Sequence, residues 1–203
     1  VVSLVLSSFH YLHFWNIQRS AWWQFYWRSP DLREDTALVL QLPPNYALAE
    51  GYEVWVPANL IYQKNADDLY IQGEIVNPEN VNAIAGGELL VKGLPSFTVA
   101  SNFQNGLITS NSSGGCLHVY DSNWFIPYIN ETPLISQAAV SSTVSQIKSG
   151  IPVRPPAAPA FGSEPTHDWC DYYQKASFSV QHNDWIVIRG IWNQIRSKKL
   201  QPA

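Results

Sequence analysis

The segment WWQFYW at residues 22–27 places five aromatic rings and one glutamine in succession, shortly before Pro30. A residue that precedes proline avoids the helical conformation, so Ser29 predicts the end of a helix. Tryptophan and tyrosine are enriched where hydrocarbon meets water, and arginine extends to lipid headgroups. One hypothesis is a membrane-interface helix, and the alternative is an aromatic-rich helix packed on a globular core. The interface residues would be Trp15, Arg19, Trp22, Trp23, Tyr26 and Trp27.

The stretch before this run, residues 1–15, is mostly apolar. It is shorter than the roughly 20 residues that a helix needs to cross a bilayer. It also lacks the basic start and the small-residue cleavage site of a signal peptide. Two interpretations stay open, the tail end of a membrane helix and an ordinary buried helix. Because the sequence contains no methionine, we expect the chain to be a piece of a longer protein.

Composition limits the partners that the chain can have. Charged residues make up 14% of the 203 residues, below the usual share of about 25%. The formal net charge is −4, which leaves no basic field to bind a phosphate backbone. The composition therefore argues against nucleic acid as a partner. The length suits one α/β domain with its own core, or a smaller domain with an appendage.

Beyond Pro30 the pattern predicts short strands and helices. Residues 36–42 and 69–76 are β-rich, and residues 77–87 predict a helix with Asn77 as cap and Pro78 at its first position. Between them, residues 52–56 alternate like a strand, and the residues that follow turn like a helix. We favour a helix over 57–63.

Four short β-rich runs follow between residues 88 and 121, with the spacing of antiparallel hairpins. Residues 132–150 then space their apolar side chains like one face of a helix that ends at Gly150. The predicted fold class is therefore α/β in the mixed α+β sense, a small mixed sheet with flanking helices.

The end of the chain predicts a strap and a helical hairpin. Residues 151–166 carry five prolines and favour an extended linker or a strap across a surface. Two amphipathic stretches follow, separated by a turn, with Asp184 as the cap of the second. Their apolar faces hold Trp169, Tyr172, Tyr173 and Ala176 on the first and Trp185, Ile188, Ile191, Trp192 and Ile195 on the second.

This hairpin resembles a tetratricopeptide-type unit. One such pair cannot bury both of its faces, so we expect it to pack on the α/β part or on further repeats, and to offer a surface to a protein partner. The predicted organisation is a membrane-proximal helix at 1–30, an α/β domain at 31–150, a strap at 151–166 and the hairpin at 167–203.

Three segments together resemble the C-terminal region of large polytopic bacterial membrane proteins. They are WWQFYWRSPDLREDTALVL, GGCLHVYD and EPTHDWCDYYQKA. In those proteins, membrane helices like those of lipid-linked-sugar glycosyltransferases precede a soluble domain and a helical-repeat tail. The resemblance implies a membrane-associated protein that transfers sugars from a lipid carrier, with the chemistry in the membrane part. It carries no catalytic residue over to this chain.

The two cysteines, Cys116 and Cys170, lie far apart in the sequence. A disulfide between them would tie the hairpin to the sheet, and closing a loop of roughly 55 residues stabilises a fold by about 4 kcal/mol. Such a bond fits an oxidising, extracytoplasmic compartment. Two buried thiols are the alternative.

Candidate residues for chemistry are scattered. His118, Asp121, His167, Asp168 and Cys170 include every residue type for a zinc site or a Cys-His nucleophile. Their spacing matches no local metal or nucleophile signature, and the His167–Asp168 pair stands where a helix cap belongs.

The sequence therefore predicts no catalytic residue and no cofactor. Two function classes remain. One is an extramembrane domain with a structural or binding role. The other is a protein-interaction module or an accessory subunit of a membrane complex. A free-standing hydrolase ranks third.

Overall fold

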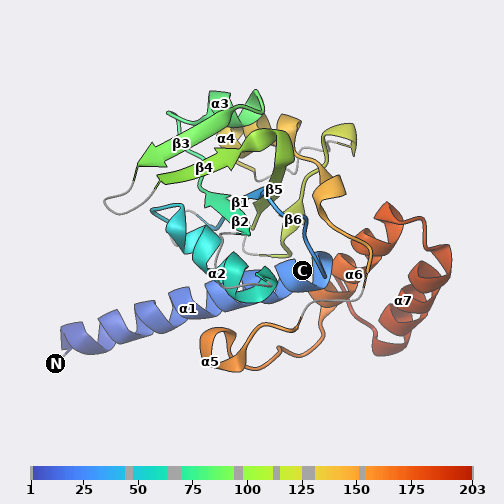
Figure 1. Ribbon diagram of the computed structural model, residues 1–203. Helices are drawn as coiled ribbons and strands as arrows, with labels where there is room; N and C mark the ends of the chain where they lie inside the picture. The colour runs from blue at the N-terminus through green and yellow to red at the C-terminus, as the bar shows by residue number, and fades with distance from the viewer. Residues whose placement is uncertain are drawn as a thin grey trace.

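The computed structural model describes residues 2–43, 48–63, 70–93, 98–111, 115–124, 131–150 and 154–202, with side chains from residue 9 onward (Figure 1). It is a mixed α+β protein, as the sequence predicts. The described helices are α1 (Val2–Arg28), α2 (Tyr52–Tyr62), α3 (Val81–Ala85), α4 (Pro133–Ala138), α5 (Ala158–Phe161), α6 (Trp169–Gln181) and α7 (Trp185–Lys198). The described 3-10 turns are η2 (Phe103–Asn105), η3 (Ser122–Trp124), η4 (Ala139–Ser141) and η5 (Val144–Gln146).

A four-stranded sheet forms the centre, with the order β2-β1-β5-β6. β1 pairs in parallel with β2 on one side and with β5 on the other, and β6 pairs antiparallel with β5. β3 and β4 form a separate antiparallel pair. The strand bounds are β1 (Thr36–Gln41), β2 (Ile71–Glu74), β3 (Leu89–Gly93), β4 (Thr98–Asn102), β5 (Gly106–Ser110) and β6 (His118–Val119).

The central sheet is buried on both faces, which explains why β1 reads as a continuous apolar run. Successive side chains of a strand point to opposite faces. Leu38 and Leu40 pack with residues of α1 and α2, whereas Ala37 and Val39 pack with residues of α3 and α4. The three layers are visible in Figure 1, with α1 and α2 below the sheet and α3 and α4 above it.

Helix α2 is longer than predicted. It begins at Tyr52 and contains Pro57, so the alternation of residues 52–56 belongs to a helix and the start at residue 57 is wrong. The Glu53 carboxylate accepts hydrogen bonds from the backbone amides of Ala49 and Glu50. These two hydrogen bonds hold the residues before the helix against its first turn, and the strand-like pattern of residues 52–56 does not reveal them.

Helix α3 is shorter than predicted, and its cap differs. Asn80 occupies the N-cap position, not Asn77. The Asn77 side chain instead accepts hydrogen bonds from the amides of Glu79 and Asn80, which makes an Asx turn before the helix. Gly86 occupies the C-cap position.

Residues 132–150 do not form one helix. α4 ends at Ala138 and two 3-10 turns follow. Ser142 leaves the helical path because its hydroxyl accepts a hydrogen bond from the amide of Ile108 and donates one to the carbonyl of Tyr120. A bond to a distant strand therefore replaces the local helix.

The prediction of successive antiparallel hairpins is correct for β3 with β4 and for β5 with β6. It is wrong for the step between β4 and β5. β5 joins the other sheet, beside β1 and parallel to it. The reason is long-range, because β1 offers an apolar edge that local spacing cannot reveal.

Asn59 locks α2 onto β2. Its amide donates to the carbonyls of Trp55 and Ile71, and its side-chain oxygen accepts from the amides of Tyr70 and Ile71. The residue is 6% exposed. The amide group thus satisfies backbone atoms at the start of β2.

We expect Asn59→Leu to lower the free energy of unfolding by about 2–4 kcal/mol, because buried backbone groups lose their partners. Urea unfolding measures this change. Asn193→Leu, at an exposed position of α7, is the matched control and should change stability by less than about 0.5 kcal/mol. Equal effects of the two substitutions would contradict the role assigned to Asn59.

Candidate functional site

The aromatic run faces protein along most of its length. Trp22 and Phe25 belong to the main core cluster. The indole of Trp23 donates to the carbonyl of Phe161, and that of Trp27 donates to the carboxylate of Glu164. Trp22, Trp23 and Trp27 are at most 8% exposed, so the interface hypothesis is wrong for these three. Residues 21–28 instead fit the alternative, an aromatic-rich helix packed on a globular core.

The proline-rich strap is the other partner of this helix. Described from residue 154 onward, it contacts the last turns of α1 from the side away from the sheet (Figure 1). Phe161 is buried in the main core, and at Gly162 an added Cβ would lie 2.8 Å from the Arg19 side chain. Arg19 therefore packs under the strap, and Trp15, Arg19 and Tyr26 are each partly buried.

The N-terminal half of α1 differs from its C-terminal half. Phe9, Tyr11 and Leu12 are 67%, 68% and 53% exposed. Figure 1 shows this half of the helix extending away from the rest of the molecule. Among the described residues, no helix combines the length and the apolar content that crossing a bilayer requires.

Gln24, the one polar residue of the aromatic run, is a buried junction. Its side-chain oxygen accepts hydrogen bonds from the backbone amide of Leu117 at 2.6 Å and from the side chain of Gln174 at 3.4 Å. The Gln174 amide also donates to the carbonyl of Leu117 at 2.6 Å. We call these three residues the Gln24 junction. It joins α1, α6 and the segment that enters β6.

The disulfide lies beside this junction. Cys116 and Cys170 are bonded at 2.06 Å, one residue before Leu117 and near the start of α6. Of the two alternatives that the sequence leaves open, the structure has the disulfide. Closing a loop of this length stabilises by about 4 kcal/mol in the chain-entropy model. The helical hairpin is thereby attached to the sheet by one covalent bond and by the Gln24 junction.

The predicted chemical residues fall into separate places. His118 lies 3.5 Å from the carboxylate of Glu131, and its ring contacts that of Tyr173. Asp168 caps α6, as its place in the sequence predicts. His167 lies 3.2 Å from the carboxylates of both Glu164 and Asp171.

Cys170 is in the disulfide, and Asp121 caps a short turn by accepting from Asn123. In the described part of the chain, no group of three or more His, Cys, Asp or Glu side chains is placed to hold a metal ion.

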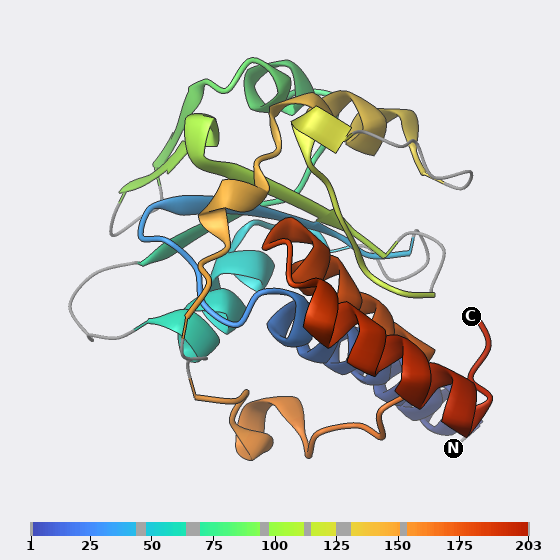
Figure 2. The same cartoon turned by 90° about the vertical axis from the view of Figure 1, so that its right-hand side faces the viewer.

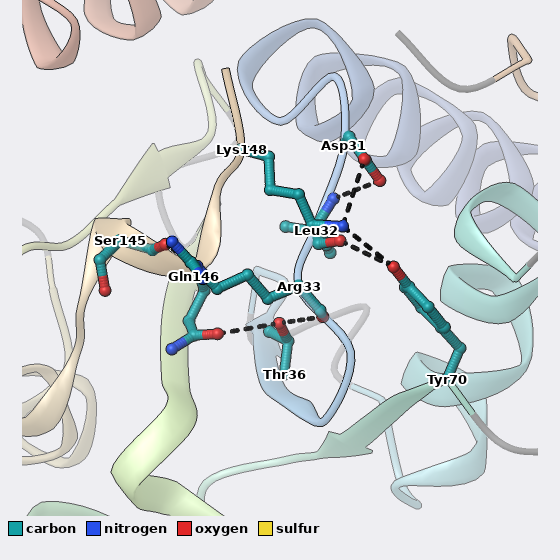
Figure 3. Close-up of polar contacts among 8 residues, drawn as sticks. All are labelled: Asp31, Leu32, Arg33, Thr36, Tyr70, Ser145, Gln146 and Lys148. Atoms are coloured by element: carbon teal, nitrogen blue, oxygen red, sulfur yellow. Dashed lines mark hydrogen bonds and ion pairs between the residues drawn. The ribbon is translucent and has the colours of Figure 1, made fainter. Parts of the chain in front are cut away.

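A groove of about 480 Å³ lies at the edge of the sheet where β1 begins. The segment from Ser145 to Lys148 pairs with the connection that leads into β1 (Figure 3). The Arg33 side chain donates to the carbonyl of Ser145 at 2.8 Å, and the opposite wall comes from the end of α6. We call this the amino-edge groove. It is lined by Arg33, Asp121, Asn123, Thr143, Val144, Ser145, Ile147, Lys148, Ser149, Gln181 and His182.

The ionisable side chains that line the groove are Arg33, Asp121, Lys148 and His182. Burial, the largest influence on Lys148, lowers its pKa, but the hydrogen bond to the Tyr70 hydroxyl and the nearby Asp31 carboxylate outweigh it and raise the pKa overall. Figure 3 shows these three side chains together. Burial and the charge of Arg28 lower the pKa of His182. At neutral pH Lys148 is therefore a cation and His182 a neutral ring.

This chemistry suits binding. The protonated Lys148 and Arg33 donate hydrogen bonds, and hydroxyls and amides surround them together with the Asp121 carboxylate and the neutral His182 ring. The groove fits a ligand with hydroxyl or carboxylate groups. Sequence reasoning missed it because its residues come from four separate segments, and none of those segments carries a local motif.

Comparisons of this chain with protein-family models, with curated proteins and with solved structures find no match. The family resemblance and the tetratricopeptide-like character of the hairpin therefore stay predictions.

We expect Gln24→Leu to lower the free energy of unfolding by about 2–4 kcal/mol, because the Leu117 amide and the Gln174 side chain lose a buried acceptor. Chemical denaturation under non-reducing conditions measures the loss while the disulfide stays intact. Gln194→Leu, at an exposed position of α7, should leave stability within about 0.5 kcal/mol of wild type. A similar small change at Gln24 would contradict the junction.

We expect His182 to titrate below its usual pKa of 6.5, for the reasons given above. Because folding lowers this pKa, the contribution of His182 to stability is present above about pH 6.5 and is lost as the pH falls through the folded-state value. NMR titration of the His182 ring checks this, and a midpoint at or above 6.5 would show that the ring is not held as described.

Proposed function

We propose that the chain is an extramembrane domain of a membrane protein, with a structural or binding role. The observation that carries the proposal is the division of α1. Its C-terminal half is embedded in protein, whereas Phe9, Tyr11 and Leu12 expose large apolar surfaces on the half that extends outward. Exposed aromatic and aliphatic side chains at the end of a helix suit contact with a bilayer or with a membrane-embedded segment.

The disulfide supports an extracytoplasmic location. Disulfides persist in oxidising compartments and are rare in the cytosol. The Cys116–Cys170 bond closes a long loop between two structural units, which is the arrangement that stabilises most in the chain-entropy model. An extracytoplasmic domain held at the membrane by α1 accounts for both features.

The finer proposal is that the membrane part resembles a lipid-linked-sugar glycosyltransferase and contains the chemistry. In that case the amino-edge groove would help to hold a hydroxylated acceptor. Its polar lining and the cationic Lys148 support this role. The alternative, a protein-interaction module, is favoured by one observation, the exposed outer surface of α7.

The membrane role of α1 predicts that the chain floats with phosphatidylcholine vesicles in a density gradient. The triple variant Phe9→Ser, Tyr11→Ser, Leu12→Ser should lose at least about tenfold in vesicle binding, because three exposed apolar side chains are removed. The matched control changes three equally exposed side chains elsewhere, by Leu89→Ser, Val91→Ser and Val140→Ser, and should still float. A chain that does not float, or one whose α1 and control variants behave alike, would overturn the proposal.

A further inference from the structure

The outer surface of α7 carries a stripe of alternating tryptophan and arginine. Trp185, Arg189, Trp192 and Arg196 follow one another at helical spacing, so they lie within about 60° of one another around the axis. All four are exposed, and the two indoles are 65% and 56% exposed. We call these four residues the α7 stripe.

The hairpin does not use this stripe for its own packing. Tyr172 of α6 packs with Ile191 and Ile195, the only two residues of α7 that are buried. The sequence placed Trp185 and Trp192 on the same apolar face as these isoleucines. In the structure the packed face is narrower, and the two tryptophans lie outside it. Ile186, which is 87% exposed, extends the apolar surface beside the stripe.

The charge of α7 differs in sign from the charge of the chain. The helix contains Arg189, Arg196 and Lys198 and no acidic residue, whereas the chain as a whole has a net charge of −4. Lys198 lies over the ring of Tyr172 on the inner side. The outer side therefore offers two guanidinium groups between and beside two indole rings.

This charge decides among occupants. A second copy of the chain, docked through α7, would bring guanidinium groups against guanidinium groups, and like charges across an interface cost several kcal/mol. A bilayer is disfavoured by position. α7 lies at one end of the molecule, and the N-terminal half of α1 extends from the opposite end (Figure 1). In the view from the α7 end, α7 is in front and α1 lies behind it (Figure 2). That a bilayer is disfavoured rests on the membrane role proposed for α1.

We propose that the α7 stripe binds an acidic amphipathic helix of a partner protein. Arg189 and Arg196 are about 10 Å apart along the axis, which matches carboxylates two helical turns apart on the partner. Guanidinium groups form two-pronged hydrogen bonds with carboxylates. The indole of Trp192 covers the aliphatic side chains between those carboxylates, and the indole of Trp185 covers those beyond the carboxylate at Arg189. Tryptophan and arginine are the residues that most often dominate binding energy at protein interfaces.

The test uses a labelled helical peptide with two glutamates two turns apart and leucines between them on the same face, and measures binding by fluorescence anisotropy. We expect saturable binding that weakens with salt. Arg189→Glu with Arg196→Glu, and separately Trp185→Ala with Trp192→Ala, should each weaken it at least about tenfold. Arg154→Glu reverses an exposed charge on the strap and is the matched control, expected to bind like wild type.

A charge-swapped pair makes the test specific. The same peptide with lysines in place of the glutamates should bind the Arg189→Glu, Arg196→Glu variant and not the wild type. Because all the substituted side chains are exposed, circular dichroism and urea unfolding of each variant should match wild type. A variant that fails to fold is replaced by its single substitutions.

Several results would overturn the proposal. They are no binding of the acidic peptide, binding unaffected by the stripe variants, and a stripe-dependent dimer in light scattering. Stripe-dependent binding to phosphatidylglycerol vesicles without peptide binding would overturn it as well, and would assign a bilayer instead. The peptide assay contains no membrane, so its outcome is separate from that of α1 flotation on phosphatidylcholine.

Discussion

The arrangement of the molecule depends on the hydrogen bonds of the buried Gln24 side chain. It lies among five aromatic residues on a helix that is buried from several sides, and its side-chain oxygen binds the entry to β6 and the middle of α6 at once. Buried polar groups without partners are costly, so each of the three segments has one favoured position relative to the others. The disulfide holds two of these segments, the entry to β6 and α6, together covalently.

The aromatic residues around Gln24 divide their contacts between two surfaces. Trp22 and Phe25 fill the space under the sheet, and Trp23 and Trp27 bind the strap through their indole N–H groups. An indole with an apolar body and one donor suits either a bilayer interface or a buried site with one acceptor. In this protein the carbonyl of Phe161 and the carboxylate of Glu164 are those acceptors. The indole chemistry that suggested a membrane interface therefore also explains how these tryptophans pack inside the protein.

Three surfaces remain for function, and they lie in different places. The amino-edge groove is polar and carries the cationic Lys148. The outer half of α1 is apolar, and the α7 stripe is aromatic and basic. In the roles proposed above, the groove would hold a polar ligand, α1 would contact a membrane and the α7 stripe would bind a protein.

The amino-acid sequence by itself determined the local features. The end of α1 before Pro30, the strand at 36–42, the cap at Asp168 and the turn before α7 all follow from residues within a few positions of one another. Only the tertiary structure decided which sides of these elements are covered. The bond from Ser142 to Ile108 ended a predicted helix, β1 drew β5 into a parallel pair, and the strap buried Trp23 and Trp27. The amino-edge groove could not be predicted for the same reason, because its lining comes from distant segments and burial depends on what packs there. The spacing of apolar residues reveals that an element has an apolar face, but it does not reveal which element packs against that face.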